Sequence, residues 1–141
     1  MFNRDKDDAA STSNRNTLHT TISIGAQAEA QAEMFLQQQG LVTRCKNYRC
    51  KLGEIDLIML QKTAQGTCFV FVEVRLRTNK RFASALSTVD YRKQQKIIRT
   101  ATRFLQERRL FDKVACRFDV IALDQTGTEP PIQWIQNAFG A

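Results

Sequence analysis

Two long apolar runs, each interrupted by carboxylates, are the feature of this sequence that most constrains its fold. Residues 54–60 read EIDLIML and residues 68–75 read CFVFVEVR. Both runs have the length and composition of β-strands, and the residues between them, 61–67, are typical of a turn. Nearly continuous apolar strands are covered on both faces. The two runs therefore predict paired strands inside a central sheet that other elements cover.

The rest of the chain alternates between helical and extended patterns. Residues 25–39 are rich in Ala and Gln and repeat apolar side chains at helical spacing, which predicts a helix that Gly40 ends. The sequence thus predicts an α/β fold with a mixed central sheet flanked by helices. The further expected elements are a strand over 41–48, a long helix over 88–108, a strand over 116–123 and an edge strand over 132–135.

The length of 141 residues fits one domain. Residues 1–24 are polar and carry no net charge, so we expect a disordered tail followed by a single domain over residues 25–141. The tail has no apolar signal segment, and no apolar run reaches the ~20 residues of a membrane span. The four cysteines match no zinc-binding spacing. We therefore expect a cytoplasmic protein with free thiols.

Carboxylates in apolar strands are costly unless they are paired or bind a metal ion. Strand alternation places Glu73 and Arg75 on one face with Phe71, and Asp56 on a face with Ile58. If the two strands are neighbours in register, Asp56 and Glu73 converge at a sheet end. Two converging carboxylates suit Mg²⁺, which keeps several waters and leaves positions for phosphate oxygens. Such a cation activates water and stabilises charge on a phosphodiester.

Plainer interpretations of the same acids stay open at this point. Glu73 and Arg75 form a surface ion pair if their strand face is exposed. Asp56 then serves a turn or neutralises Arg117. Arg117 also shares a strand face with Asp119, and we favour a structural ion pair between these two over a catalytic role.

The net charge of +7 is concentrated in one part of the chain. Residues 75–117 hold 13 basic side chains against three acidic ones. Such a surplus predicts an anionic partner, either a nucleic acid or a membrane surface. Carboxylates inside strands have no role at a membrane, so nucleic acid is the expected partner and no membrane contact is expected.

A basic stripe follows the predicted second helix. At about 100° per residue, four cations share a narrow sector opposite the apolar side of the helix. This stripe is either a solvated helix face or a surface that tracks phosphates. Lys93 lies between the basic and apolar sectors, so it is better placed than Lys96 to reach the sheet. The four cations of the stripe are Arg92, Lys96, Arg99 and Arg103.

The sequence contains five notable short motifs: GxxxExxA at 25–32, GEIDLI at 53–58, FVEVRxR at 71–77, KQxK at 93–96 and RFDV at 117–120. Together they resemble those of a small bacterial family, the YraN-like proteins. These proteins are placed among the PD-(D/E)xK nucleases, beside archaeal Holliday-junction resolvases. The resemblance implies a restriction-endonuclease-like αβββαβ core, which agrees with the expected order of elements. It covers nearly all of residues 25–139.

The resemblance also implies roles for particular residues. Asp56 corresponds to the metal-binding aspartate of the superfamily, and Glu73 to its second acidic ligand. Glu29, on the first helix, matches a glutamate that supports the metal in resolvase-like members. The carbonyl of Val74 is a further implied ligand.

One position departs from the superfamily signature. Arg75 stands where the signature has lysine. A guanidinium is always protonated and takes no proton from water, although it binds phosphate well. Water activation then falls to the metal or to a lysine of the second helix, for which Lys93 and Lys96 are the candidates. The departure bears on catalytic activity more than on fold or binding.

These features lead to one principal expectation and two rivals. The first is an endonuclease that uses Mg²⁺ (or Mn²⁺) on branched or structured DNA, with a homodimer suited to a two-fold symmetric junction. Arg75 then binds the scissile phosphate, and Arg77, Lys80 and Arg81 hold the flanking backbone. The first rival is a non-catalytic nucleic-acid-binding protein with a nuclease-like fold. The second rival is a protein-interaction adaptor without affinity for nucleic acid.

Overall fold

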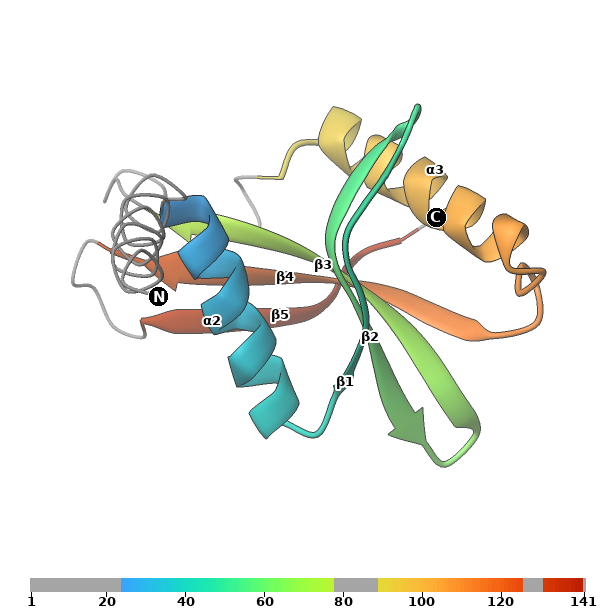
Figure 1. Cartoon of the computed structure of the whole chain (residues 1–141), viewed down its shortest axis with the longest axis horizontal. Coiled ribbons are helices and arrows are strands. Elements are labelled where there is room, and N and C mark those ends of the chain that lie inside the picture. The colour runs from blue at the N-terminus through green and yellow to red at the C-terminus, as the bar shows by residue number, and fades with distance from the viewer. Residues whose placement is uncertain (1–23, 78–88, 126–130, 141) are drawn as a thin grey trace, which may run out of the picture.

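Four strand pairings build one mixed five-stranded sheet in the order β1-β2-β3-β4-β5. The computed structural model describes residues 24–77, 89–125 and 131–140 (Figure 1). The β3–β4 pair is parallel and the other three pairs are antiparallel. The elements, in chain order, are α2 (Ile24–Gln38), β1 (Val42–Cys50), β2 (Gly53–Thr63), β3 (Gly66–Arg77), α3 (Tyr91–Glu107), β4 (Ala115–Asp124) and β5 (Ile132–Phe139).

This order confirms the predicted α/β fold, and it matches a restriction-endonuclease-like αβββαβ core. The sheet is mixed because α3 carries the chain from the end of β3 back to the start of β4, which makes that pair parallel. No helix in the described ranges has the length and apolar character needed to cross a bilayer. Except for Ile24, which opens α2, the predicted tail 1–24 lies outside the described residues.

Three predicted boundaries are wrong. The turn between β2 and β3 is shorter than residues 61–67, because the ladder continues to the pair Thr63–Gly66. The second helix begins at Tyr91 rather than at residue 88, because the Asp90 carboxylate accepts a hydrogen bond from the Lys93 backbone N–H and caps the first turn. The last strand extends to Phe139 rather than to residue 135. The ends of β2 and β5 carry polar residues, so the apolar pattern did not indicate how far these strands extend.

Each face of the sheet packs against its own helix. Phe69 and Phe71 of β3 point to the α3 side, where they join a buried cluster around Phe104. Val70 and Val72 alternate to the other side and pack with the buried face of α2. The sheet is therefore covered on both faces, as the apolar runs predict.

Strict alternation fails between Ile55 and Ile58 of β2. The β1–β2 ladder skips the pair Asn47 and Asp56, although the register is the same on both sides of it. On either side of Asp56, Ile55 and Ile58 both pack in the cluster on the α3 side, so the alternation expected along β2 is wrong there. The register itself shifts elsewhere, between Thr43 and Cys45 of β1. Beyond the skipped pair, Gly53 lies against α3.

A buried carboxylate braces β4 and β5. Asp119, with no exposed surface, accepts hydrogen bonds from the Arg117 guanidinium, from the Trp134 indole N–H and from the backbone N–H of Asn137. Arg117 also donates to the side chain of Gln61 on β2. This arrangement confirms the structural Arg117–Asp119 pair, and Trp134 is a packed anchor that also meets the ring of Phe35 edge to face.

We expect Asp119→Asn to destabilise the fold by about 3–5 kcal/mol, because it breaks a buried ion pair and turns an amide N–H₂ toward groups that donate hydrogen bonds. Urea unfolding measures the change. The control is Glu54→Gln, which removes an exposed ion pair with Arg49 and should cost less than about 1 kcal/mol. Similar losses in the two variants would contradict a bracing role for Asp119.

Candidate active site

The site begins where β2 separates from β3. Their last ladder pair is Leu57 and Val72, so the next pair in the same register is Asp56 and Glu73. In place of a backbone partner, the Val74 N–H donates to Asp56 Oδ2 at 2.8 Å. The N–H and C=O of one strand residue point to the same edge, so the Val74 carbonyl faces the same gap. The structure thus brings together Asp56, Glu73 and Val74, as the sequence predicts.

Glu73 is buried, with only 5% of its surface exposed. Its Oε1 lies 3.5 Å from Arg75 Nη1 and 3.8 Å from Lys93 Nζ. An ion pair with Arg75 therefore exists, but it is not the surface pair of the plainer interpretation. Asp56 neither serves a turn nor neutralises Arg117, which binds Asp119 instead.

The carboxyl groups of the site lie where negative charge is costly. Burial, and then the nearby charge of Asp56, raise the pKa of Glu73 to about 7. Burial also raises the pKa of Asp56, against the opposing effect of the Val74 N–H. The pKa of Glu29 on α2 is raised by burial and by the Asp56 charge. Asp56 is therefore close enough to interact with Glu73 and with Glu29.

These residues suit a divalent cation only if other oxygens, from water or substrate, complete its coordination shell. Within the described residues, no three His, Cys, Asp or Glu side chains are arranged to enclose a metal ion. Mg²⁺ does not require such an enclosure, because one or two carboxylates with waters and phosphate oxygens complete its shell. Asp56 and Glu73 would hold the cation, the Val74 carbonyl faces the same gap, and Glu29 lies beside Asp56. Burial is the main cause of both raised pKa values, and a bound cation would offset the cost of burying these negative charges.

The two candidate lysines differ in position. Lys93, half-exposed in the first turn of α3, leans toward Glu73, whereas Lys96 is exposed. The expectation that Lys93 is the better placed of the two is confirmed. Arg75 pairs with the same oxygen, Glu73 Oε1, so two cations lie next to one buried carboxylate.

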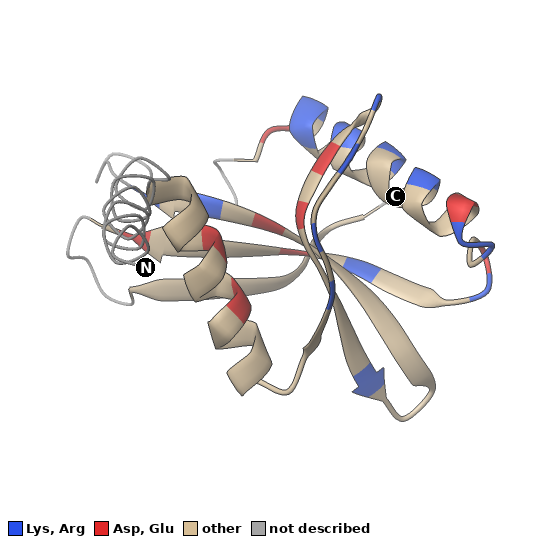
Figure 2. Cartoon of the chain, viewed as in Figure 1, with Lys and Arg blue, Asp and Glu red and all other residues tan. Residues whose placement is uncertain are grey.

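The basic stripe of α3 faces solvent. Figure 2 shows Lys and Arg positions along the outer side of this helix. The buried residues Ile97, Ala101 and Phe104 lie on its inner side. Arg103 also pairs with Glu107 at 2.9 Å. The exposed members are the four predicted ones, Arg92, Lys96, Arg99 and Arg103.

The remaining predicted contacts are Arg77, Lys80 and Arg81. Lys80 and Arg81 lie outside the described residues. Arg77 is half-exposed at the end of β3, where the register sets it beside Asp124 on β4.

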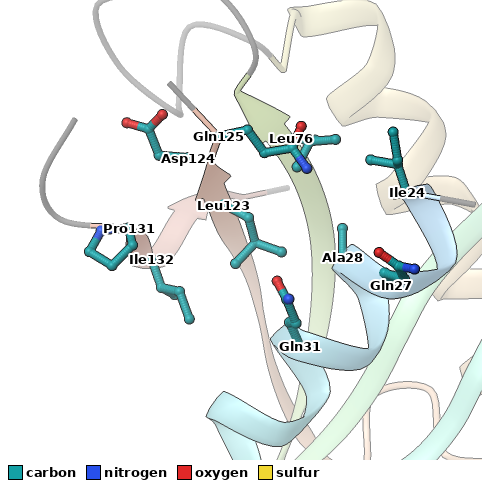
Figure 3. A pocket seen from close by; sticks show the side chains of 10 residues that line it. All are labelled: Ile24, Gln27, Ala28, Gln31, Leu76, Leu123, Asp124, Gln125, Pro131 and Ile132. Carbon is teal, nitrogen blue, oxygen red and sulfur yellow. The ribbon is translucent and has the colours of Figure 1, made fainter. Parts of the chain in front are cut away.

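A separate cavity lies away from this site. Figure 3 shows it between α2 and the ends of β3, β4 and β5, with a volume of about 290 Å³. None of the described candidate residues lines it. The apolar residues around it include Ile24, Ala28, Leu76, Leu123 and Ile132.

The model of the uncharacterised protein family UPF0102 matches residues 28–123, which run from α2 to the end of β4. The chain belongs to UPF0102. This is the YraN-like family that the sequence motifs resemble. The residues matched to UPF0102 include Glu29, Asp56 and Glu73, so the candidate site lies inside the family region.

Similarity to individual UPF0102 proteins extends over most of each chain. One from Psychromonas ingrahamii is 47% identical over 122 residues, 86% of this chain and 93% of that protein. One from Pseudomonas aeruginosa is 46% identical over 119 residues, 83% of this chain and 92% of that protein. One from Saccharophagus degradans is 48% identical over 115 residues, 82% of this chain and 91% of that protein.

Sequence reasoning missed one residue at the site. Asn47 of β1 has a left-handed backbone with φ of 52°, and it lines the same cavity as Glu29 of α2. Asparagine is one of the few residues that tolerate this conformation. An asparagine inside a strand was the available signal, but its meaning depends on α2 lying next to it.

We expect Glu73→Gln to stabilise the chelator-treated protein at alkaline pH. The pKa of Glu73 is about 7 in the folded state against an ordinary value of 4.5, so the native state binds the extra proton between these values. The free energy of unfolding therefore falls as the pH rises through this range. The neutral amide of glutamine removes the free-energy cost of ionising Glu73 in the folded protein. This cost is about 1–3 kcal/mol at pH 8 and little at pH 4.

Urea unfolding at pH 4 and pH 8 measures this difference. The control is Glu107→Gln, an exposed acid on α3 whose pKa is lowered by its hydrogen bond from Arg103. That variant should not stabilise the protein at either pH. Destabilisation by Glu73→Gln at pH 8 would contradict the electrostatics described for the site.

Proposed function

We propose that this UPF0102 protein is a metal-dependent endonuclease that cleaves branched or structured DNA with Mg²⁺ (or Mn²⁺). The observation that carries the proposal is the pair Asp56 and Glu73, two acids with raised pKa values at the end of the β2–β3 ladder. Two cations flank the pair, and an exposed basic helix lies beside it. An anionic substrate and a divalent cation together satisfy this charge pattern.

A bound Mg²⁺ would activate a water molecule and neutralise charge that develops on the phosphodiester. Arg75 stays protonated, so its role is to bind a phosphate oxygen and hold the scissile group. Lys93 is near enough to Glu73 to bind the scissile phosphate as well, or to hold a proton at its Nζ atom. The stripe on α3 binds flanking phosphates.

A binding protein without catalysis is the second candidate, and a specific observation favours it. Glu73 already has two cationic neighbours, and the signature lysine is replaced by Arg75. Those contacts supply part of the charge that a metal would otherwise supply. The cleavage experiment below separates the two candidates.

The proposal extends to assembly and location. A four-way junction has two-fold symmetry, which a homodimer matches by presenting one site to each of two strands. Cleavage of branched DNA belongs to repair or recombination, and we propose that this protein acts there in the cytoplasm.

We expect metal-dependent cleavage of a four-way junction, with less cleavage of linear duplex or single strands. Asp56→Asn and Glu73→Gln should reduce the rate at least 100-fold while leaving DNA binding intact, because they remove the metal ligands and keep the cationic surface. Lys93→Met should lower the cleavage rate about 10²-fold or more. Its matched control, Lys96→Met, should weaken binding and leave the rate at saturating DNA unchanged.

Gel assays with Mg²⁺, Mn²⁺ or EDTA give the result. Salt-sensitive binding without cleavage under any metal would support the binding protein. Failure to bind nucleic acid at low salt would overturn both candidates and favour a protein-interaction adaptor.

We expect the stripe on α3 to set the salt dependence of binding. The double variant Arg92→Gln/Arg99→Gln should reduce the slope of log K against log salt by about 2, because each lost phosphate contact removes about one unit. Fluorescence anisotropy over a salt series measures the slope. Lys62→Gln is the control, because Lys62 is an exposed cation near the β2–β3 turn. An equal change in this control would contradict a specific role for α3.

A further inference from the structure

The sheet has a gap in its ladders at Asp56. Between Lys46–Leu57 and Tyr48–Ile55, the β1–β2 ladder skips the pair Asn47 and Asp56. On its other side, Asp56 also lies beyond the last β2–β3 pair. Asp56 therefore sits where both neighbouring ladders are interrupted.

The gap has a local cause in β1. Asn47 adopts φ of 52°, in the left-handed region that most side chains avoid. One residue in this conformation reverses the alternation of the strand, and as a result Cys45 and Tyr48 both pack toward α3. A strained residue of this kind persists where the surrounding structure requires it, and such residues gather at functional sites.

The side chain of Asn47 points to α2. Asn47, Glu29 and Leu57 line a cavity of about 190 Å³ between α2 and β1. Burial and the charge of Asp56 raise the pKa of Glu29, and its interaction with the Asn47 side chain opposes them. Further along the same helix face, Glu33 pairs with Lys46 at 3.5 Å and accepts a hydrogen bond from Thr43 at 2.7 Å. Polar contacts thus attach α2 to β1 next to the site.

We propose that Asn47 is a positioning residue for metal binding, whose left-handed backbone opens the sheet at Asp56 and whose amide holds Glu29 beside it. This inference rests on the metal centre of the proposed function. Asn47 is not itself a proposed metal ligand, and it acts through the Glu29 carboxylate that it orients. Residues that orient metal ligands typically contribute 10-fold to 100-fold in metal affinity, by restricting the ligand to one position.

The chain offers a matched control. Asn137 of β5 is also left-handed, with φ of 51°. Its backbone N–H donates to Asp119 rather than to an acid of the candidate site, and a glycine keeps that N–H. Glycine tolerates a positive φ at either position, so Asn47→Gly and Asn137→Gly delete the amides without straining the backbone.

The test is Mn²⁺ binding to the chelator-treated full chain, followed by electron paramagnetic resonance, with thermal unfolding of each variant. We expect Asn47→Gly to weaken Mn²⁺ binding about 10-fold, with an unfolding midpoint close to that of Asn137→Gly. Asn137→Gly should bind Mn²⁺ as the unmodified protein does. In a Glu29→Gln background, Asn47→Gly should weaken binding less than 3-fold, because the residue through which it acts is already altered.

Three results would overturn the inference, and they differ in whether they also refute the proposed function. If the unmodified protein binds Mn²⁺ and Asn47→Gly binds it equally well, the positioning role of Asn47 is wrong and the proposed function stands. If the unmodified protein does not bind Mn²⁺, both the metal centre and the role of Asn47 are wrong. A loss of affinity that is as large in the Glu29→Gln background would also refute an effect transmitted through Glu29.

Discussion

A sheet that is covered on both faces leaves little water to solvate a carboxylate, so each acid in its inner strands needs partners inside the protein. α2 and α3 bury the two faces of β2, β3 and β4 almost completely. Among the acids of these strands, Asp56, Glu73 and Asp119 meet this requirement in different ways, and that difference separates a structural role from the candidate chemistry.

Asp119 is fully compensated by a guanidinium, an indole and a backbone N–H. Asp56 receives a hydrogen bond from Val74 but also faces the charge of other acids, and Glu73 has two cations at the longer distances of 3.5 and 3.8 Å. A carboxylate with satisfied oxygens supports structure, whereas carboxylates with raised pKa values have capacity for a proton or a cation. The same residue type therefore has two roles in neighbouring strands.

The positive charge of the protein acts at a different scale from these buried contacts. The cations of α3 are exposed and lie on the side of the helix away from the core, where each contributes little to folding. Their value is collective, because a row of exposed charges attracts a polyanion at long range. Lys93 lies between this row and the buried acids, because it belongs to the same helix and also pairs with Glu73.

The sequence alone determined the α/β class and the order of the elements, because hydrophobic periodicity is a local property of the chain. It predicted the convergence of Asp56 and Glu73 only on the condition that their strands pair in register, and the structure supplies that register. The sequence also indicated Lys93 and the exposed stripe, since both follow from helical geometry. Only the tertiary structure decided that alternation breaks at Asn47 and Asp56, because that break depends on how two strands and α2 pack together. The tertiary structure likewise decided that Arg117 forms its ion pair with Asp119. Burial and distance, not spacing along the sequence, select the partner of a charged side chain.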